Sequence, residues 1–90
     1  MELNIDWDQE KNILLQKTRG VSFEDVEDAI LNDKIIDIVP HHNQEKYPHQ
    51  EIIIIEIKGY IYYVPFVLDE EKIFLKTIIP SRKYNKRNQK

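Results

Sequence analysis

The stretch that decides the fold is residues 52–68, IIIIEIKGYIYYVPFVL, the most hydrophobic run in this 90-residue chain. It is long enough to raise the question of a membrane span, but Glu56, Lys58 and Gly59 interrupt it near its middle. Its β-branched and aromatic residues instead predict two strands, with a tight hairpin turn at Lys58 and Gly59.

Alternation along this hairpin predicts a sheet that is apolar on both faces. Side chains two residues apart share a face, which groups Ile53 with Ile55 and Ile57, and Ile52 with Ile54. Two helices cover only one face. We therefore expect the second face to be covered by the C-terminal tail, a second copy or another protein, and to carry Ile52, Ile54 and some of Tyr60, Tyr62 and Phe66.

The remaining elements are a short strand over residues 3–6, two helices, a strand over 34–39 and a last strand over 73–80. Asp8 caps a helix that runs to residue 17, buries Ile13, Leu14 and Leu15, and is closed by Gly20. Ser22 and Asp25 form a capping box for a second helix over residues 23–32. Pro65 predicts a bulge or a sheet edge, because proline cannot donate to the ladder.

The element order is therefore βααββββ. It predicts an α+β fold, with two N-terminal helices packed on one face of a mostly antiparallel twisted sheet. The length indicates one domain over residues 1–90, in which residues 79–90 form a basic C-terminal tail. With no cysteine and no apolar leader segment, we expect a cytoplasmic protein with no membrane partner.

Charge is distributed unevenly along the chain. Six of the 13 Lys and Arg residues lie from residue 76 onward, where there is no acid, and all 16 Asp and Glu residues precede them. The net charge of −3 therefore conceals a basic end on an acidic body. This end is predicted to meet a polyanion.

These features resemble the BrnT-type toxins of bacterial type II toxin-antitoxin modules, which are compact ribonucleases related to the RelE superfamily. The resemblance rests on the opening IDWDQEKN, the phrase GVSFEDV at residues 20–26, the hairpin that follows a polar loop, and the end IIPSRK at residues 78–83. It covers nearly the whole chain. It implies a metal-independent endoribonuclease that acts on RNA, in the main messenger RNA, and a cognate antitoxin, of the ribbon-helix-helix type, as partner.

The match to the family's functional positions is limited to Arg82. Family members commonly show Lys-His-Gly where this chain has Thr18-Arg19-Gly20, and an acid a few residues after the arginine, where Asn88 stands here. The chain thus resembles a divergent branch. Its proton acceptor has to be sought elsewhere.

Metal-independent RNA cleavage needs a base, an acid and cations around the phosphate. Arg82 is the first candidate for the phosphate, and Lys76, expected on one strand face with Phe74 and Ile78, is the second. His41 and His49 are the candidate acid and base, because an imidazole titrates near neutral pH. No cofactor and no metal site are expected, since three histidines on one loop, HHNQEKYPHQ at residues 41–50, give poor ligand geometry.

The predicted RNA contacts combine cations with aromatic rings on which an unpaired base can stack. They lie in the polar loop and in the tail: Lys46, Tyr47, Ser81, Lys83, Tyr84, Lys86 and Arg87. Three alternatives stay open. In the first, the tail only solubilises the chain's end. In the second, the chain is a non-catalytic domain of the same fold that binds RNA or a partner, and in the third it is a structural subunit that forms a homo- or hetero-oligomer through its second apolar face.

Overall fold

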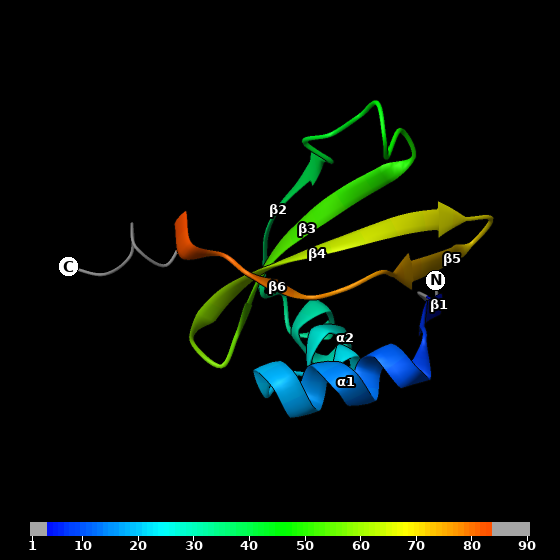
Figure 1. Ribbon diagram of the computed structural model, residues 1–90. Helices are drawn as coiled ribbons and strands as arrows, with labels where there is room; N and C mark the ends of the chain where they lie inside the picture. The colour runs from blue at the N-terminus through cyan, green and yellow to red at the C-terminus, as the bar shows by residue number, and fades with distance from the viewer. Residues whose placement is uncertain (1–3, 84–90) are drawn as a thin grey trace.

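The computed structural model of the chain describes residues 4–83 and confirms the α+β fold (Figure 1). Two helices precede most of a six-stranded sheet whose strands follow the order β1-β5-β4-β3-β2, with β6 also paired to β4. All pairs are antiparallel except β1 with β5, so the mostly antiparallel sheet was predicted correctly. The elements are β1 (Asn4–Trp7), α1 (Gln9–Arg19), α2 (Phe23–Leu31), β2 (Ile35–Pro40), β3 (Gln50–Ile57), β4 (Tyr60–Asp69), β5 (Lys72–Leu75) and β6 (Ile79–Pro80).

Both helices begin at the residues that the sequence indicates, whereas α1 ends at Arg19, two residues later than predicted, and α2 ends at Leu31, one residue earlier. The Asp8 carboxylate accepts from the N–H of Glu10 at 2.9 Å, and Gly20 closes α1 in the left-handed conformation at φ 68°. Ser22 caps α2, and the Asp25 carboxylate accepts from the N–H of Ser22 at 3.0 Å, which completes the capping box. These bonds are local, so where each helix starts depends on residues close to it in the sequence.

The buried side of α1 differs from the prediction. Leu15 is buried, but Ile13 and Leu14 are 46% and 52% exposed. Three consecutive residues span about 200° of a helix and cannot all face one side. The residue that shares the buried side is Asn12, three positions before Leu15.

Asn12 of α1 is only 2% exposed, and its side chain is hydrogen-bonded to α2. Its side-chain oxygen accepts from the N–H of Phe23 at 2.7 Å, and its Nδ2 donates to Glu24 at 2.6 Å. The first backbone donor of α2, which no helical carbonyl can reach, is therefore satisfied inside the core. One side chain thus fixes the angle at which α2 leaves α1.

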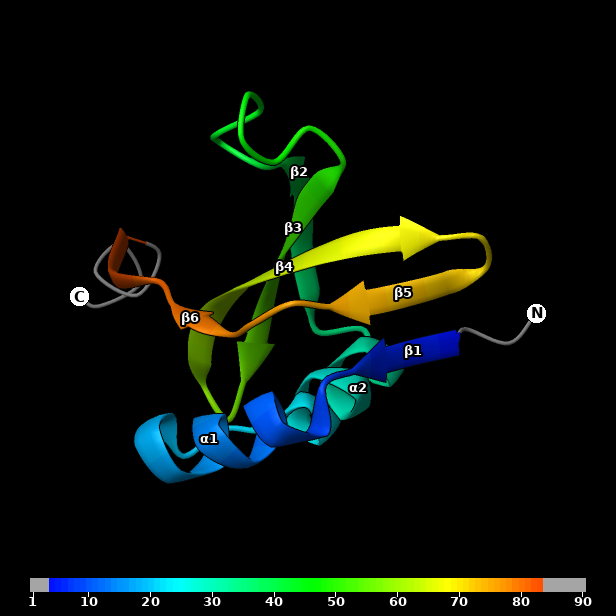
Figure 2. The ribbon, with the colours of Figure 1, turned by 45° about the vertical axis from the view of Figure 1, so that its right-hand side comes forward.

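The sheet has a helix face, on which Ile53, Ile55 and Ile57 pack against the helices, and a far face on the opposite side (Figures 1 and 2). Strand pairing places Val64 beside Ile53 and Tyr62 beside Ile55. Tyr60, which pairs with Ile57, lies on the helix face together with Tyr62 and Phe66, and the expectation that some of these three lie on the second face is wrong. Ile61 and Tyr63 take those places, and the far-face cluster consists of Ile52, Ile54, Ile61, Val39 and Tyr63.

The predicted last strand is divided into β5 and β6 by a bulge. Between the pairs Leu75–Phe66 and Ile79–Tyr63 the last segment advances four residues while β4 advances three. Pro65 lies opposite this step and accepts from the N–H of Lys76 at 2.8 Å. The prediction of a bulge at Pro65 is confirmed, because a residue without an N–H sits where the ladder is interrupted.

In both outer strands, β1 and β2, an aspartate side chain accepts a hydrogen bond from the N–H of the residue that follows it. Asp37 in β2 accepts from the N–H of Ile38 at 2.8 Å, and Asp6 in β1 accepts from the N–H of Trp7 at 2.8 Å. A backbone donor bound by the preceding side chain is not free to pair with another strand, and Pro40 has no donor at all. The sheet edges are thereby protected although β2 exposes Ile36 and Ile38. No helix within residues 4–83 is long and apolar enough to cross a membrane.

Candidate nucleic-acid interface

The polar loop between β2 and β3 is organised around His41 and Asn43. The N–H of Asn43 donates to Nδ1 of His41 at 3.0 Å, and the Asn43 carbonyl accepts from the N–H of Tyr47 at 2.9 Å. The Asn43 side chain accepts from the N–H of Lys46 at 3.1 Å, and the Gln44 amide donates to the His41 carbonyl. Although the loop is polar, this network leaves His41 only 9% exposed.

The environment of His41 decides what its imidazole can do. Burial, and secondarily the neighbouring His42 ring, lowers the pKa of His41. Its Nδ1 accepts the Asn43 N–H, so this nitrogen is unprotonated and the proton resides on Nε2. The lone pair needed to remove a proton is already engaged. His41 therefore organises the loop in this conformation and is not a free base.

Aromatic rings and a cation gather around His41. Its ring lies 4.5 Å from that of His42 and 4.5 Å from that of Tyr47, and Nζ of Lys46 stands 5.4 Å from the Tyr47 ring. The N–H of His41 donates to the Gln50 carbonyl at 3.1 Å, which extends the ladder one residue beyond β2. By alternation His41 then shares the far face with Val39. The predicted RNA contacts Lys46 and Tyr47 therefore lie at the loop end of the far face.

A second cation–aromatic pair lies on the same face. Leu75 is part of the helix-face core, so its neighbour Phe74 points to the far face. Nζ of Lys76 stands 5.3 Å from the Phe74 ring. The expected grouping of Lys76 with Phe74 is therefore correct. Its grouping with Ile78 is wrong, because the bulge reverses the alternation and turns Ile78 into the helix-face core, where it is fully buried.

The end of the described chain adds further predicted residues. The N–H of Ser81 donates to the Ile61 carbonyl at 3.0 Å, and Ser81 is 1% exposed, whereas Arg82 and Lys83 are exposed. Arg19, at the end of α1, donates to the Ile78 carbonyl just before β6 and so ties the helix layer to this segment. No pattern in the sequence predicts that contact. Tyr84, Lys86 and Arg87 lie outside the described residues.

The predicted catalytic residues are not brought into one cluster. Glu51 pairs with Phe66, and Ser81 bonds to Ile61, five residues away along β4. At about 3.3 Å per residue these positions are roughly 17 Å apart along the strand, and they flank β4 on opposite sides. A general base must come within about 3 Å of the proton it removes. His49, two residues before Glu51, and Arg82, next to Ser81, therefore do not meet at one phosphate in this conformation.

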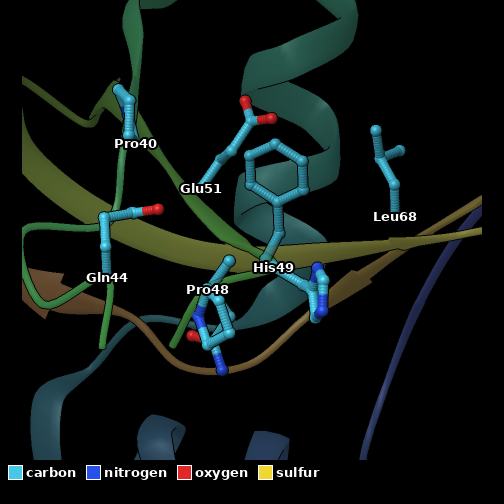
Figure 3. Close-up of a pocket in the computed structure, with 8 residues that line it drawn as sticks. Pro40, Gln44, Pro48, His49, Glu51 and Leu68 are labelled. Carbon is cyan, nitrogen blue, oxygen red and sulfur yellow. The ribbon is translucent and has the colours of Figure 1, made fainter. Parts of the chain in front are cut away.

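His49 lines a pocket of about 470 Å³ between the loop and the ends of β3 and β4 (Figure 3). Its walls include Pro40, Gln44, Pro48, Glu51 and Leu68, and Phe66 contributes from β4. The Glu51 carboxylate and the His49 ring point to different sides of the pocket. Since Glu51 shares the helix face with Phe66, the pocket opens on that face, toward the end where the loop lies and away from the helices (Figure 1).

The sequence analysis does not single out Glu51. No local pattern marks it, because His49 lies before β3 and the two residues come together at the pocket only through the folded loop. Within residues 4–83 no group of three or more His, Asp or Glu side chains is arranged to hold a metal ion. No protein-family model, curated protein or solved structure matches the chain.

Proposed function

We propose that this protein is an RNA-cleaving toxin of the BrnT type that holds a single-stranded RNA along the far face of its sheet. The observation that carries the proposal is the pair of cation–aromatic contacts on that face, Lys46 with Tyr47 and Lys76 with Phe74. Each pair offers a ring to a base and an ammonium to a phosphate, the combination that single-strand binding requires. Arg82 and Lys83 extend the row of cations toward the chain's end.

The spacing of the two pairs suits an extended strand. His41 and Tyr47 are associated with β2, and Lys76 lies beside β4 on the side away from β3, so about three strand spacings of 4.8 Å separate them. That is roughly 14 Å across the face. The far face therefore supports several adjacent contacts to one chain and does not enclose a single small ligand.

In the cleavage step His49 is the base. It removes the proton of a ribose 2′-hydroxyl, the 2′-oxygen attacks the adjacent phosphorus, and the bond from phosphorus to the 5′-oxygen breaks. The 5′-oxygen takes a proton from water, and the products are a 2′,3′-cyclic phosphate and a 5′-hydroxyl. His49 suits this role because its imidazole is exposed in the pocket, whereas Nδ1 of His41 is engaged by Asn43.

Expression of the chain alone tests the proposal. We expect growth arrest and RNA cleavage, and we expect His49→Ala to lower the rate at saturating RNA by about 10²–10⁴-fold, the usual contribution of a general base. Arg82→Ala is expected mainly to weaken RNA binding, since Arg82 lies far from His49. His42→Ala is the matched control, because His42 is an exposed imidazole of the same loop outside the pocket. An unchanged rate in His49→Ala would remove His49 from the mechanism.

A second candidate is a non-catalytic RNA-binding domain of the same fold. It is favoured by the distance of roughly 17 Å along β4 between the surroundings of His49 and those of Arg82. Under this alternative the purified chain binds RNA without cutting it, and the affinity falls steeply with salt. Cleavage by wild-type protein that is lost in His49→Ala excludes it.

The proposed toxin activity implies an antitoxin, and a ribbon-helix-helix protein encoded beside this chain is the partner we propose. Masking the far face would block both cation–aromatic pairs at once. Co-expression tests this: the neighbouring protein should relieve growth arrest and protect Lys76 from acetylation in the complex. Growth arrest that persists with every neighbouring gene product would contradict the assignment.

A further inference from the structure

The pocket beside the loop has the chemistry of a base-reading site. It is lined by apolar surface from Pro40, Pro48 and Leu68, and its polar groups lie at its sides (Figure 3). Leu68 is 62% exposed, so this apolar surface is accessible to a ligand. A flat, uncharged ring can lie against such walls, because burying it removes apolar area from water.

The polar side chains of the pocket favour hydrogen-bond donors. Nε2 of Gln44 donates to the His41 carbonyl, so the loop fixes the amide and leaves its Oε1 as an acceptor at the pocket. The Glu51 carboxylate adds two more acceptor oxygens, and among residues 4–83 no Lys or Arg lines the pocket. A phosphate would lie beside the Glu51 carboxylate here, without a lysine or arginine of the described residues to hold it. A neutral group that presents two adjacent N–H donors would be held by both carboxylate oxygens.

Among the four RNA bases only guanine has two adjacent N–H donors on its Watson–Crick edge, N1–H and the N2 amino group. Adenine and cytosine offer one amino donor beside an acceptor, and uracil offers one N–H between two acceptors. RNA-binding proteins commonly read unpaired bases at this edge. We infer that the pocket binds an unstacked guanine, whose N1–H and N2–H donate to Glu51 while its ring lies against Pro48 and Leu68.

This inference rests on the proposed RNA function and adds a substrate preference to it. The loop connects the two sites, since Lys46 and Tyr47 of the far face lie one to three residues from Pro48 and His49 of the pocket. A chain that passes Tyr47 can therefore turn one base into the pocket. His49 then lies beside the ribose of that guanosine, which predicts cleavage on its 3′ side.

The test compares two fluorescent hexaribonucleotides, one all uridine and one identical except for a single central guanosine. To exclude cleavage, binding is measured in an RNA whose 2′-hydroxyls are methylated. We expect wild-type protein to bind the guanosine-containing strand about 10-fold more tightly, within the range for a bidentate contact to a base. Inosine, which lacks the N2 amino group, should lose most of that preference.

Glu51→Gln replaces one acceptor oxygen with a donor and should reduce the preference for the guanosine-containing strand to within about 2-fold. Glu45→Gln removes the same charge from an exposed residue of the same loop that does not line the pocket, and it should retain the preference. An equal affinity of the wild type for both strands, or a preference that survives Glu51→Gln, overturns the inference. The unfolding midpoint of Glu51→Gln shows that the variant is folded.

Free nucleosides separate this inference from the proposed function. Guanosine, but not adenosine, should shift the NMR signals of His49 and Leu68 even if the far face binds no RNA at all. RNA binding without any shift by guanosine leaves the proposed function standing and overturns the pocket assignment. Shifts produced by arginine amide but not by guanosine also overturn it, because the pocket would then take a guanidinium from a partner protein.

Discussion

The two faces of the sheet are built from alternate residues of the same strands, yet their chemistry differs. On the helix face, Phe23, Ile55, Val64 and Ile78 are almost completely buried in one continuous core. On the far face the buried cluster is limited to three isoleucines, and around it lie rings paired with cations. The comparison teaches that stability and candidate function can be separated here, because neighbouring residues in a strand serve opposite faces.

Replacing one aromatic ring on each face by alanine should give the largest difference between the two faces. Phe23 is 0% exposed and stacks on Trp7 with ring centroids 5.7 Å apart. Phe23→Ala should lower the free energy of unfolding by about 3–5 kcal/mol, through lost burial and the cavity left behind. Urea unfolding followed by circular dichroism measures this loss.

Phe74→Ala is the matched change on the far face. Because Phe74 is only half-buried and pairs with Lys76, we expect a loss of about 1 kcal/mol in unfolding free energy and a marked loss of RNA affinity. Equal destabilisation by both substitutions would show that the two faces do not divide stability and binding in this way.

The second largest effect on the free energy of unfolding is expected at Asn12, which connects the two helices. Asn12→Ala leaves the Phe23 N–H without a partner inside the core, which should cost about 1–3 kcal/mol in unfolding free energy. Asn32→Ala removes a side chain that bonds only to Asp28 at the exposed end of α2 and should cost less than about 0.5 kcal/mol. A neutral Asn12→Ala would mean that water satisfies the Phe23 N–H.

Local patterns predicted the helix caps and the alternation of β3 correctly, because capping and strand geometry depend on a few neighbouring residues. The Ser22–Asp25 capping box and the αL residue Gly20 are examples. The face taken by Tyr62 and Phe66 was not predicted, because it depends on the register in which β4 pairs with β3. Periodicity within β4 alone does not fix that register.

The candidate site was predicted less completely than the fold. Lys76, Lys46 and Tyr47 were named from composition, but their shared face depends on the bulge at Pro65 and on the folded loop. Arg19 and Glu51 gave no strong signal, since each contributes through contacts with segments distant in sequence. Such contacts follow from tertiary packing, which no local sequence pattern encodes.

Removing one positive charge from the far face should have a smaller effect, on RNA binding alone, and so tests whether that face binds RNA. Lys76→Ala is expected to weaken RNA binding several-fold and to reduce the log–log salt slope by about 0.7, the value for one phosphate contact on a single strand. Lys58→Ala is the matched control, since Lys58 is exposed at the hairpin turn and pairs with Asp25 of α2 at 3.9 Å. Equal slopes for both variants would show that Lys76 does not meet a phosphate.

The smallest expected effect is a pH dependence that belongs to the loop end of the far face. The folded-state pKa of His41 is lowered below its usual value of 6.5, so the unfolded chain takes up the proton first as the pH falls. The contribution of neutral His41 to the free energy of unfolding is therefore fully present above pH 6.5 and declines as the pH falls below it. Protonated Nδ1 can no longer accept the Asn43 N–H, and the charge lies beside His42.

Unfolding free energies measured in steps between pH 7.5 and 5 test this sign, with wild type compared against His41→Gln. We expect the wild type to lose more stability toward low pH than the variant, whose glutamine does not titrate. The difference between the two curves isolates His41, because every carboxylate is common to both proteins. A variant curve that falls as steeply as the wild-type curve would assign the acid sensitivity to the carboxylates, and the loop end of the far face would then be as insensitive to pH as the apolar core behind it.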